Sequence, residues 1–348
     1  MLGATESSKT SIEVDLYGFV KPQRAGGLSE SFIRVDGSSE CQPLCTPANN
    51  CEKTMKLDTT FEFEELRPDL ARLAYRMLGT RSDTDDVLQD AYLRWSNTDR
   101  DEVRSTRAFL NTIVTRLCID RRREIDVRKE TYVGPWLPEP IVESGSFGMT
   151  DRVEMGETVS LALMHVMETL SPTERAAYLL RKVFDYDYVE ISSILDKSEA
   201  NCRQLVSRAE SHIQSERPRF ETSSAEIERI SNEFLHACET GDLEGLVELL
   251  SDDVVIYSDG GGKALAALRP LEGVDKASRF LIGVFKKGLS GAEIVRVRVN
   301  GQIGFAAFLA GQLTTVWVMD VVDGHVRRCF SIRNPDKLAR VRVTRTGS

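Results

Sequence analysis

A short stretch of the chain carries side chains that can hydrogen-bond to the edges of bases and to phosphates. These side chains belong to Asn201, Arg203, Gln204, Ser207 and Arg208. On a helix that enters a major groove, such groups contact base edges directly. On any other exposed helix, they form an ordinary solvated face. Their chemistry therefore depends on the elements that hold them.

The surrounding residues predict two helices joined by a tight turn. An upstream helix begins with a capping box, Ser171 to Glu174, and has Pro172 at its first position. Asp196 and Lys197 form the later turn, and Ser198 can cap the helix that follows it. The apolar residues that recur at helical spacing and are expected to face inward are Tyr188, Ile191, Ile194, Leu195, Cys202, Val206, Ala209 and Ile213. The pattern favours a helix-turn-helix that reads DNA, with an ordinary helical hairpin as the alternative.

Acidic residues open a helix earlier in the chain. Asp83, Asp85, Asp86 and Asp90 have no basic residue among them. Their apolar neighbours, which form the buried stripe of this helix, are Val87, Leu88, Ala91 and Trp95. Acids in a first turn suit the positive end of the helix dipole, which is one explanation. The other explanation is a contact surface for a basic partner.

Basic side chains gather on the next predicted helix, from Ser105 to about Arg123. The segment 104–129 holds eight basic and three acidic residues, a net of +5 in a chain whose net charge is -9. The polar and basic residues expected away from its apolar face are Asn111, Thr112, Thr115 and Arg116, and three arginines, Arg121, Arg122 and Arg123, crowd its end. A basic last turn suits the helix dipole. A run this dense beside short polar side chains is better explained as a nucleic-acid surface.

The composition limits the classes to which the protein can belong. With 348 residues, of which 28% are charged and 41% hydrophobic, the chain is expected to form two or three soluble globular domains. No apolar run approaches the roughly 20 residues of a membrane helix, and no secretory signal is recognisable. The net charge of -9 argues against general coating of DNA, so a DNA-binding surface must be local. Cys118 and Cys202 fall within helical patterns, which indicates buried thiols in a reducing, cytoplasmic compartment.

Three further segments complete the organisation of the chain. Residues 1–56 lack a sustained period and are expected to be a disordered extension, whose cysteines fit no zinc template. Residues 129–155 contain prolines and glycines and form a linker, in which the apolar Trp136 and Leu137 favour docking. From residue 223, two helices precede a series of β-like runs, which predicts an α+β domain with an antiparallel meander and a curved sheet. The predicted strands are 254–257, 293–299, 303–309, 313–321 and 326–332, with a helix at about 274–286.

Residues capable of acid–base chemistry are scattered over this C-terminal part. His236 and His325 lie near the ends of elements and form no spacing with Asp259, Asp320 or Asp323 that demands catalysis. A lone helical histidine is more often structural. The glycine-rich segment 259–263 can form a phosphate-binding nest, but it lacks the rest of a P-loop, so a docking loop is the preferred interpretation. The sequence predicts no enzyme, no cofactor and no metal site.

Several motifs, in this order, resemble those of the extracytoplasmic-function sigma factors, which are small bacterial transcription initiation factors. They are Arg-Leu-Ala-Tyr-Arg-Met-Leu-Gly (72–79), Asp-Thr-Asp-Asp-Val-Leu-Gln-Asp-Ala (83–91), Phe-Leu-Asn-Thr-Ile-Val-Thr-Arg-Leu-Cys-Ile-Asp (109–120) and the helix-turn-helix. Residues 223–338 resemble a SnoaL-like domain, a cone-shaped α+β fold. The motifs that resemble the subgroup with this fused domain are Trp-Leu-Pro-Glu-Pro (136–140), Asp-Gly-Gly-Gly-Lys (259–263) and Asn-Pro-Asp-Lys-Leu (334–338).

The resemblance implies a multi-domain chain with two all-α domains that bind DNA and polymerase, followed by the α+β cone. The expected ranges are 1–56 for the extension, 57–128 for sigma region 2, 129–155 for the linker, 156–217 for sigma region 4 and 223–341 for the SnoaL-like domain.

The resemblance also implies roles for individual residues. The residues expected to bind polymerase are Asp85, Asp86, Gln89 and Asp90. The residues expected at the minus-10 element are Trp95, Asn111, Thr112, Thr115, Arg116, Arg121 and Arg122. The residues expected at the minus-35 element are Ser198, Asn201, Arg203, Gln204, Ser207 and Arg208. Leu205 stands where many members carry a basic residue, so base contacts are expected to shift to Arg203, Gln204 and Ser207.

Control of activity is expected within the chain, through contacts of the linker with the C-terminal domain. The residues expected at these contacts are Trp136, Leu137, Pro138, Asp259, Gly260, Gly261, Gly262, Lys263, Asn334, Pro335, Asp336, Lys337 and Leu338. Asn334 and Pro335 can start a terminal segment that Leu338 anchors.

The expected partners are core RNA polymerase, through its β′ clamp and β flap, and promoter DNA. Neither a membrane nor a separate anti-sigma protein is expected, and a small ligand of the cone is left open. Two alternatives also remain open: a ligand-sensing regulator that binds DNA unaided, and a SnoaL-like isomerase or cyclase tethered to DNA-binding helices.

Overall fold

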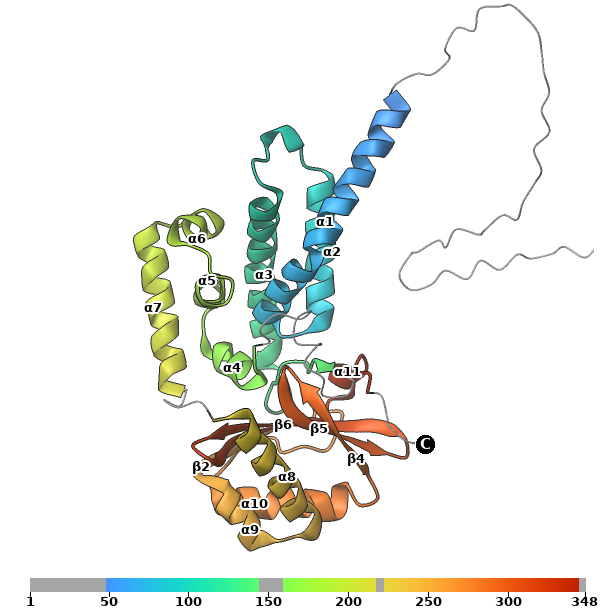
Figure 1. Cartoon of the computed structure of the whole chain (residues 1–348), viewed down its shortest axis with the longest axis vertical. Coiled ribbons are helices and arrows are strands. Elements are labelled where there is room, and N and C mark those ends of the chain that lie inside the picture. Colours follow the sequence, from blue (N-terminus) through green and yellow to red (C-terminus); the bar gives the residue numbers. More distant parts are fainter. Residues whose placement is uncertain (1–47, 144–158, 217–221, 344–348) are drawn as a thin grey trace, which may run out of the picture. The chain divides into compact units, whose positions relative to one another are not determined.

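The computed structural model describes residues 48–143, 159–216 and 222–343 (Figure 1). Two cysteines of the expected extension, Cys41 and Cys45, therefore lie outside the described residues. Helix α1 (Ala48–Leu78) begins at Ala48, well before residue 57, where we expected the first domain to start.

Three long helices form the first helical group. Helix α1 is followed by α2 (Arg81–Ser96), a 3-10 turn η1 (Arg100–Glu102) and α3 (Thr106–Glu130). The hydroxyl of Thr80 caps α2, and that of Ser105 caps α3, because each accepts a backbone N–H of the first turn. Helix α3 continues beyond the expected end near residue 123, since Ile125 still packs in the core. The linker therefore begins at Thr131.

A second group of short helices contains the predicted helix-turn-helix. Its elements are α4 (Leu161–Val166), the 3-10 turn η3 (Met167–Thr169), α5 (Pro172–Lys182), α6 (Tyr188–Leu195) and α7 (Glu199–Glu216). The capping box at Ser171 and Glu174 is confirmed, with Pro172 at the first position of α5. Of the helix expected from about residue 152, the part up to 158 lies outside the described residues.

The C-terminal part is an α+β domain, as expected. Its elements are α8 (Ser224–Thr240), α9 (Leu243–Leu249), β2 (Leu250–Asp259), β3 (Leu271–Glu272), α10 (Val274–Gly283), the π-helical turn η4 (Val284–Gly288), β4 (Glu293–Val299), β5 (Gln302–Leu309), β6 (Gln312–Val322), β7 (His325–Ile332) and α11 (Pro335–Leu338).

The strands form one seven-stranded sheet in the order β1-β4-β5-β6-β7-β2-β3. Strands β4 to β7 make the predicted antiparallel meander, with tight turns at Asn300-Gly301 and Asp323-Gly324, all four with positive φ. Two features differ from the expectation. Strand β2 pairs parallel with β7, and the linker itself supplies β1 (Val142–Glu143), which pairs antiparallel with β4.

The two faces of this sheet pack against different parts of the chain. Helices α8, α9 and α10 cover one face, where Phe305, Trp317 and Met319 are buried (Figure 1). Residues that alternate with them, such as Val316 and Val318, point to the other face, because side chains alternate along a strand. Residues of the linker, of α4 and of the stretch from α11 onward cover that second face. They are Leu137, Leu161, Ala162, Leu338 and Val341.

Within the part of the chain that the structure describes, no helix combines the length and the apolar character needed to cross a membrane.

Candidate functional site

Helix α7 presents the polar face that the sequence predicts. Cys202, Val206, Ala209 and Ile213 are all buried and fix the orientation of the helix against α5 and α6. Asp196 takes the left-handed conformation in the turn, with φ of 53°, and the Ser198 hydroxyl accepts the N–H of Asn201. The residues left exposed are Ser198, Asn201, Arg203, Gln204, Ser207 and Arg208. The helix-turn-helix and its outer surface are therefore as expected.

Arg203 is held in place on this surface. Its guanidinium lies 4.3 Å from the ring centroid of Tyr188, and its Nη2 is 2.8 Å from a carboxylate oxygen of Glu199. An arginine above an aromatic ring and beside a carboxylate has fewer rotamers to lose when it meets a base. Arg203 is thus prepositioned on the exposed face.

The basic helix α3 lies against the helix-turn-helix. The side chain of Arg116 donates to the carbonyl of Ile194 at 3.1 Å and to that of Ser193 at 3.3 Å. The amide of Asn111 donates to the hydroxyl of Tyr186. Helices α3 and α6 make direct contact along this face. The helix expected to read the minus-10 element therefore packs against α6, while the residues expected at the minus-35 element stay exposed on α7.

Four of the residues expected at the minus-10 element are buried. They are Trp95, Asn111, Thr115 and Arg122. For this conformation, the expectation that Trp95 and Arg122 face DNA is wrong. Trp95 is a core residue next to Phe109, whereas Thr112, Arg116 and Arg121 keep partial or full exposure.

Arg122 belongs to a buried cluster of charges around Glu168. Its two terminal nitrogens lie 3.0 and 2.8 Å from the two carboxylate oxygens of Glu168. Arg175 reaches the same carboxylate at 2.9 Å, and the ammonium of Lys129 also contacts it. Burial lowers the pKa of Arg122 and lowers that of Arg175 further. Glu168 therefore offsets cations that come from both helical groups.

The signal for this cluster was present in the sequence. Arg122 falls on the same helical face as Val114, Cys118 and Ile125, all of which are buried. An arginine on an apolar stripe requires a buried partner. Glu168 itself, in an irregular turn, carries no periodic signal.

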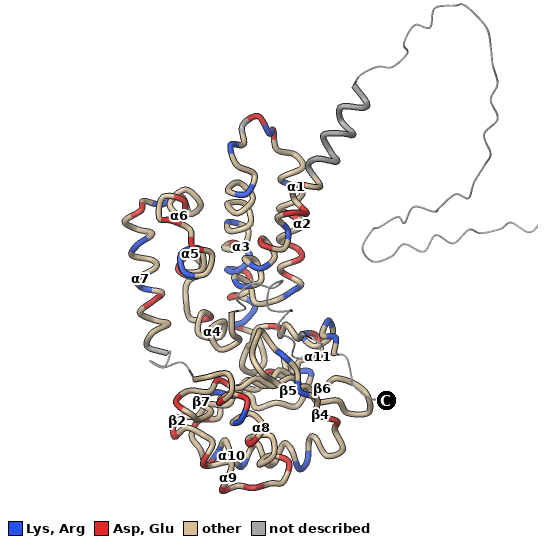
Figure 2. Tube along the Cα trace, viewed as in Figure 1, with Lys and Arg blue, Asp and Glu red and all other residues tan. Residues whose placement is uncertain are grey.

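The acidic face of α2 is exposed, as expected. Asp85, Asp86, Gln89 and Asp90 are all exposed, and Figure 2 shows acidic residues in α2 beside basic residues in α3. Asp83 is buried instead, where it accepts from Thr80 and pairs with Arg128 at 2.8 Å. Helix capping and the helix dipole thus explain Asp83. They do not explain the exposed acids further along α2.

Asp259 joins the linker to the C-terminal domain. Its carboxylate accepts the hydroxyl of Tyr132 at 2.6 Å, the N–H of Leu137 at 2.9 Å and the ammonium of Lys337 at 2.6 Å. Lys337 also donates to the carbonyl of Leu137 and lies 3.8 Å from the ring centroid of Trp136. Burial lowers the pKa of Lys337, and Asp259 opposes that effect. Three segments distant in sequence thus meet at one buried carboxylate.

The glycine loop closes over this junction. A Cβ on Gly261 would collide with the amide of Asn334 and lie 2.9 Å from the hydroxyl of Tyr132, so the close backbone approach predicted for the loop is confirmed. Lys263 pairs with Asp336 at 2.5 Å. Asn334 caps α11 with Pro335 at its start, and Leu338 is buried, which confirms the predicted terminal anchor.

The linker makes further contacts that the sequence did not indicate. Asn300, in the β4–β5 turn, donates to the hydroxyl of Tyr75 at 2.9 Å and accepts the N–H of Ile141 at 3.1 Å. The Asn300-Gly301 pair indicates a hairpin turn but not its partners. The carboxylate of Glu139 accepts the N–H of Arg81 at 2.7 Å. The linker is thus bonded to the first helical group as well as to the sheet.

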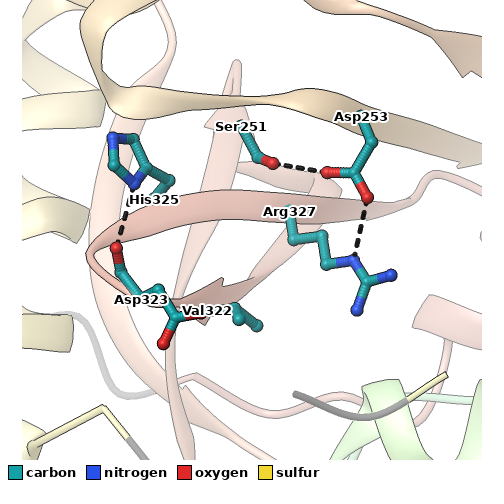
Figure 3. A pocket seen from close by; sticks show the side chains of 6 residues that line it. All are labelled: Ser251, Asp253, Val322, Asp323, His325 and Arg327. Atoms are coloured by element: carbon teal, nitrogen blue, oxygen red, sulfur yellow. Dashed lines mark hydrogen bonds and ion pairs between the residues drawn. The ribbon is translucent and has the colours of Figure 1, made fainter. Parts of the chain in front are cut away.

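The histidines and acids considered for catalysis do not gather in one site, although His325 and Asp323 line the same recess. His236 lies exposed on α8, and Asp320 pairs with Arg328. His325 lines a polar recess of about 270 Å³ with Ser251, Asp253, Val322, Asp323 and Arg327 (Figure 3). In this recess the Ser251 hydroxyl lowers the pKa of Asp253, which also pairs with Arg327 at 3.3 Å. An ionised, paired aspartate at an open recess is poorly suited to act as a general acid.

Among the described residues, no group of three or more histidines, cysteines or acids is placed to hold a metal ion.

Comparisons with known proteins agree with the arrangement of helices. The sequence profile of Sigma-70 region 2 matches residues 63–127, and that of Sigma-70, region 4 matches residues 160–213. The ECF RNA polymerase sigma factor SigJ of Mycobacterium tuberculosis is 37% identical over 293 residues, which are 79% of this chain and 92% of that protein. The probable ECF RNA polymerase sigma factor SigI of the same species is 26% identical over 80% of this chain and 93% of its own length.

The fold is similar to a solved structure along most of its length. The crystal structure of Mycobacterium tuberculosis SigJ superimposes with a TM-score of 0.65 and 34% identity, over 80% of this chain and 98% of that chain. The similarity includes both helical groups and the C-terminal α+β domain.

Proposed function

The chain belongs to the ECF RNA polymerase sigma factors, and from this membership we propose how its described surfaces divide the work of promoter-specific initiation. Regions 2 and 4 direct core polymerase to promoters in this family. We assign the exposed face of α7 to the minus-35 element. Arg203, Gln204 and Ser207 supply donors and acceptors for base edges. Arg208, on the same exposed face, contacts a backbone phosphate.

The exposed acids of α2 form the polymerase contact in this proposal. Asp85, Asp86, Gln89 and Asp90 project from one rigid helix, and an acidic surface of this kind complements a basic partner. We place the β′ clamp there and the β flap at the region 4 helices. This division follows the resemblance of the motifs and the exposure of the side chains.

The described conformation is a closed form in this proposal. The observation that carries it is the pair of bonds from Arg116 of α3 to the carbonyls of Ser193 and Ile194. These bonds join the minus-10 helix to the helix-turn-helix. While the bonds persist, the two helical groups cannot bind the two separate promoter elements at the same time. Opening releases Asn111 and Arg116 from these contacts, so that they can meet DNA together with Thr112 and Thr115. Trp95 and Arg122 keep their roles in the core.

The fused C-terminal domain controls the opening in this proposal. The carboxylate of Asp259 holds the linker at Tyr132 and Leu137, and the linker connects the two helical groups. A restraint on the linker limits the distances that the groups can reach, and a few hydrogen bonds can be shifted by polymerase or a signal. Control of this kind requires no separate anti-sigma protein, and its place is the cytoplasm, where core polymerase works.

A catalytic role for the C-terminal domain finds less support. The described interior of the cone is filled by apolar side chains, among them Phe305, Trp317 and Met319. Acid–base chemistry requires titratable groups that face a shared cavity. We therefore propose that the domain is regulatory and not an enzyme.

Energy transfer between two dyes tests the closed form directly. One dye is placed at residue 123 of α3 and the other at residue 207 of α7, both of which are exposed. Transfer is expected to be high in the free protein and to fall when core polymerase and promoter DNA are added. Run-off transcription by the same labelled protein confirms that it is active. Equal transfer in the free protein and in the promoter complex contradicts the proposal.

A further inference from the structure

The described segment that follows helix α11 contacts the acidic helix α2. Helix α11 is followed by a segment, Ala339–Val343, in which Val341 is buried and Arg340 is exposed. Leu338 and Val341 anchor this segment to the second face of the sheet, and the N–H of Val341 donates to the carbonyl of Leu338 at 3.0 Å. The backbone on both sides of Arg340 is therefore fixed.

Arg340 reaches across to Asp85. Its Nη1 lies 2.6 Å from Oδ2 of Asp85, and the two side chains are 50% and 59% exposed. The two residues are 255 positions apart in sequence. Asp85 is one of the four exposed residues that we assign to polymerase binding.

The charges of the two segments are complementary. Positions 337–343 contain one lysine and two arginines and no acidic residue. Arg340 also lies close enough to Glu139, a linker residue bonded to the first residue of α2, to oppose the rise that burial causes in the pKa of that carboxyl. A basic C-terminal segment thus lies at the same acidic surface that a basic partner would use.

We propose that Arg340, through its ion pair with Asp85, competes with core polymerase for the acidic face of α2. This inference rests on the proposed polymerase contact and adds a regulatory contact to it. Arg340 holds Oδ2 of Asp85, so a polymerase side chain that uses this oxygen must displace it. An exposed pair of this kind changes a binding equilibrium by about fivefold or less. The contact therefore tunes the affinity for polymerase and does not abolish binding.

Binding of the full-length protein to core polymerase tests the competition. Arg340→Gln is expected to tighten binding by about two- to fivefold, and the gain is expected to shrink as salt increases. Arg342→Gln is the matched control, because Arg342 is an exposed arginine two residues further along the same segment. It is expected to leave the affinity unchanged.

A double substitution separates competition from any effect on folding. In an Asp85→Asn background, Arg340→Gln is expected to add nothing, because the pair is already lost. An equal gain in both backgrounds overturns the inference, as does unchanged or weaker binding by Arg340→Gln alone.

Asp90→Arg distinguishes failure of the inference from failure of the proposed contact. If Asp90→Arg weakens polymerase binding while Arg340→Gln has no effect, the polymerase contact stands and the competition is overturned. If Asp90→Arg leaves binding unchanged, the acidic face is not the docking surface, and the competition falls with it.

Discussion

Lys337 and Asp259 form a buried ion pair, with the ammonium nitrogen 2.6 Å from the carboxylate oxygen. Their side chains are 7% and 0% exposed. The carboxylate also accepts from Tyr132 and Leu137 of the linker, and the ammonium also donates to the carbonyl of Leu137. Because the segments that the pair joins lie far apart in sequence, loss of either partner affects the linker as well as the C-terminal domain.

Removal of one partner from this pair is expected to be costly. Lys337→Met leaves the carboxylate of Asp259 buried without its cation, and such changes destabilise proteins by about 3–5 kcal/mol. The double variant Lys337→Met, Asp259→Asn is expected to recover part of the loss, because no uncompensated charge remains. Urea unfolding of the two variants and of the unmodified protein measures both effects. A double variant less stable than Lys337→Met contradicts this account.

Gly261 and Gly291 provide a matched pair for the close approach of the glycine loop. Both have positive φ, +58° and +75°, so alanine is strained at either position. A Cβ at Gly291 meets nothing within 4 Å, whereas a Cβ at Gly261 collides with Asn334. Gly291→Ala is expected to cost about 1–2 kcal/mol from the backbone alone. Gly261→Ala is expected to cost clearly more, and equal losses in thermal unfolding would remove the reason for glycine at this junction.

Glu168 is expected to matter for stability and not for DNA affinity. Glu168→Gln leaves three cations around a neutral amide, and the expected loss is about 3–5 kcal/mol. The control is Glu210→Gln, which breaks the more exposed pair with Lys182 and is expected to cost at most about 1 kcal/mol. Arg122→Ala is likewise expected to lower stability while the salt dependence of promoter binding stays the same. A flatter salt dependence in Arg122→Ala would restore the phosphate contact predicted from sequence.

Arg203 is expected to discriminate between bases. Arg203→Ala should cost about 1–3 kcal/mol at one position of the minus-35 element and little elsewhere. Arg208→Ala is expected to weaken binding to all promoter variants alike, as a phosphate contact does. Binding to a set of single-base promoter variants measures both patterns. Uniform losses in both variants would contradict the division of roles on α7.

His165 is expected to make stability depend on pH. Burial, together with the charges of Arg328 and Lys129, lowers the pKa of His165 to about 4, and its ring lies among Tyr257 and Phe330. A histidine whose pKa is lower in the folded state is protonated first in the unfolded state. Stability is therefore lost as the pH falls from about 6.5 toward 4, by at most about 3 kcal/mol.

Substitution of His165 isolates this contribution from the titration of carboxylates. His165→Phe keeps an aromatic ring between α4 and the sheet but removes the proton-binding group. The difference in unfolding free energy between this variant and the unmodified protein is expected to change with pH over that range. A constant difference would assign the pH dependence to other groups.

The parts of the fold that local patterns determine were predictable from the sequence. The capping box at Ser171, the left-handed turn at Asp196 and the buried face of α7 depend on neighbours within a few residues. The parallel pairing of β2 with β7 was not predictable, because alternation within a strand does not encode the direction of its partner. Strand β1 was missed for a related reason, since two residues in a proline-rich linker carry no period.

The residues of the candidate site also divide into those that local patterns predict and those that they do not. The outward residues of α7 and α2 follow from helical spacing alone. The hydrogen bond of Asn111 to Tyr186 joins positions 75 residues apart, which no local pattern predicts. Family motifs give the roles of these residues in an open complex with DNA, and cannot give the contacts they make when the two helical groups are closed.

During synthesis on the ribosome, the linker is made well before the residues that hydrogen-bond to it. Ile141 completes its hydrogen bonds with Asn300, and Leu137 completes its own with Lys337, 159 and 200 positions further along the chain. At about 5–20 residues per second, a ribosome needs about 10–40 s to make the second interval. During that time both helical groups have left the ribosome while the segment between them still lacks its partners. Each newly made molecule therefore passes through a stage in which its promoter-binding modules exist before the restraint on them does.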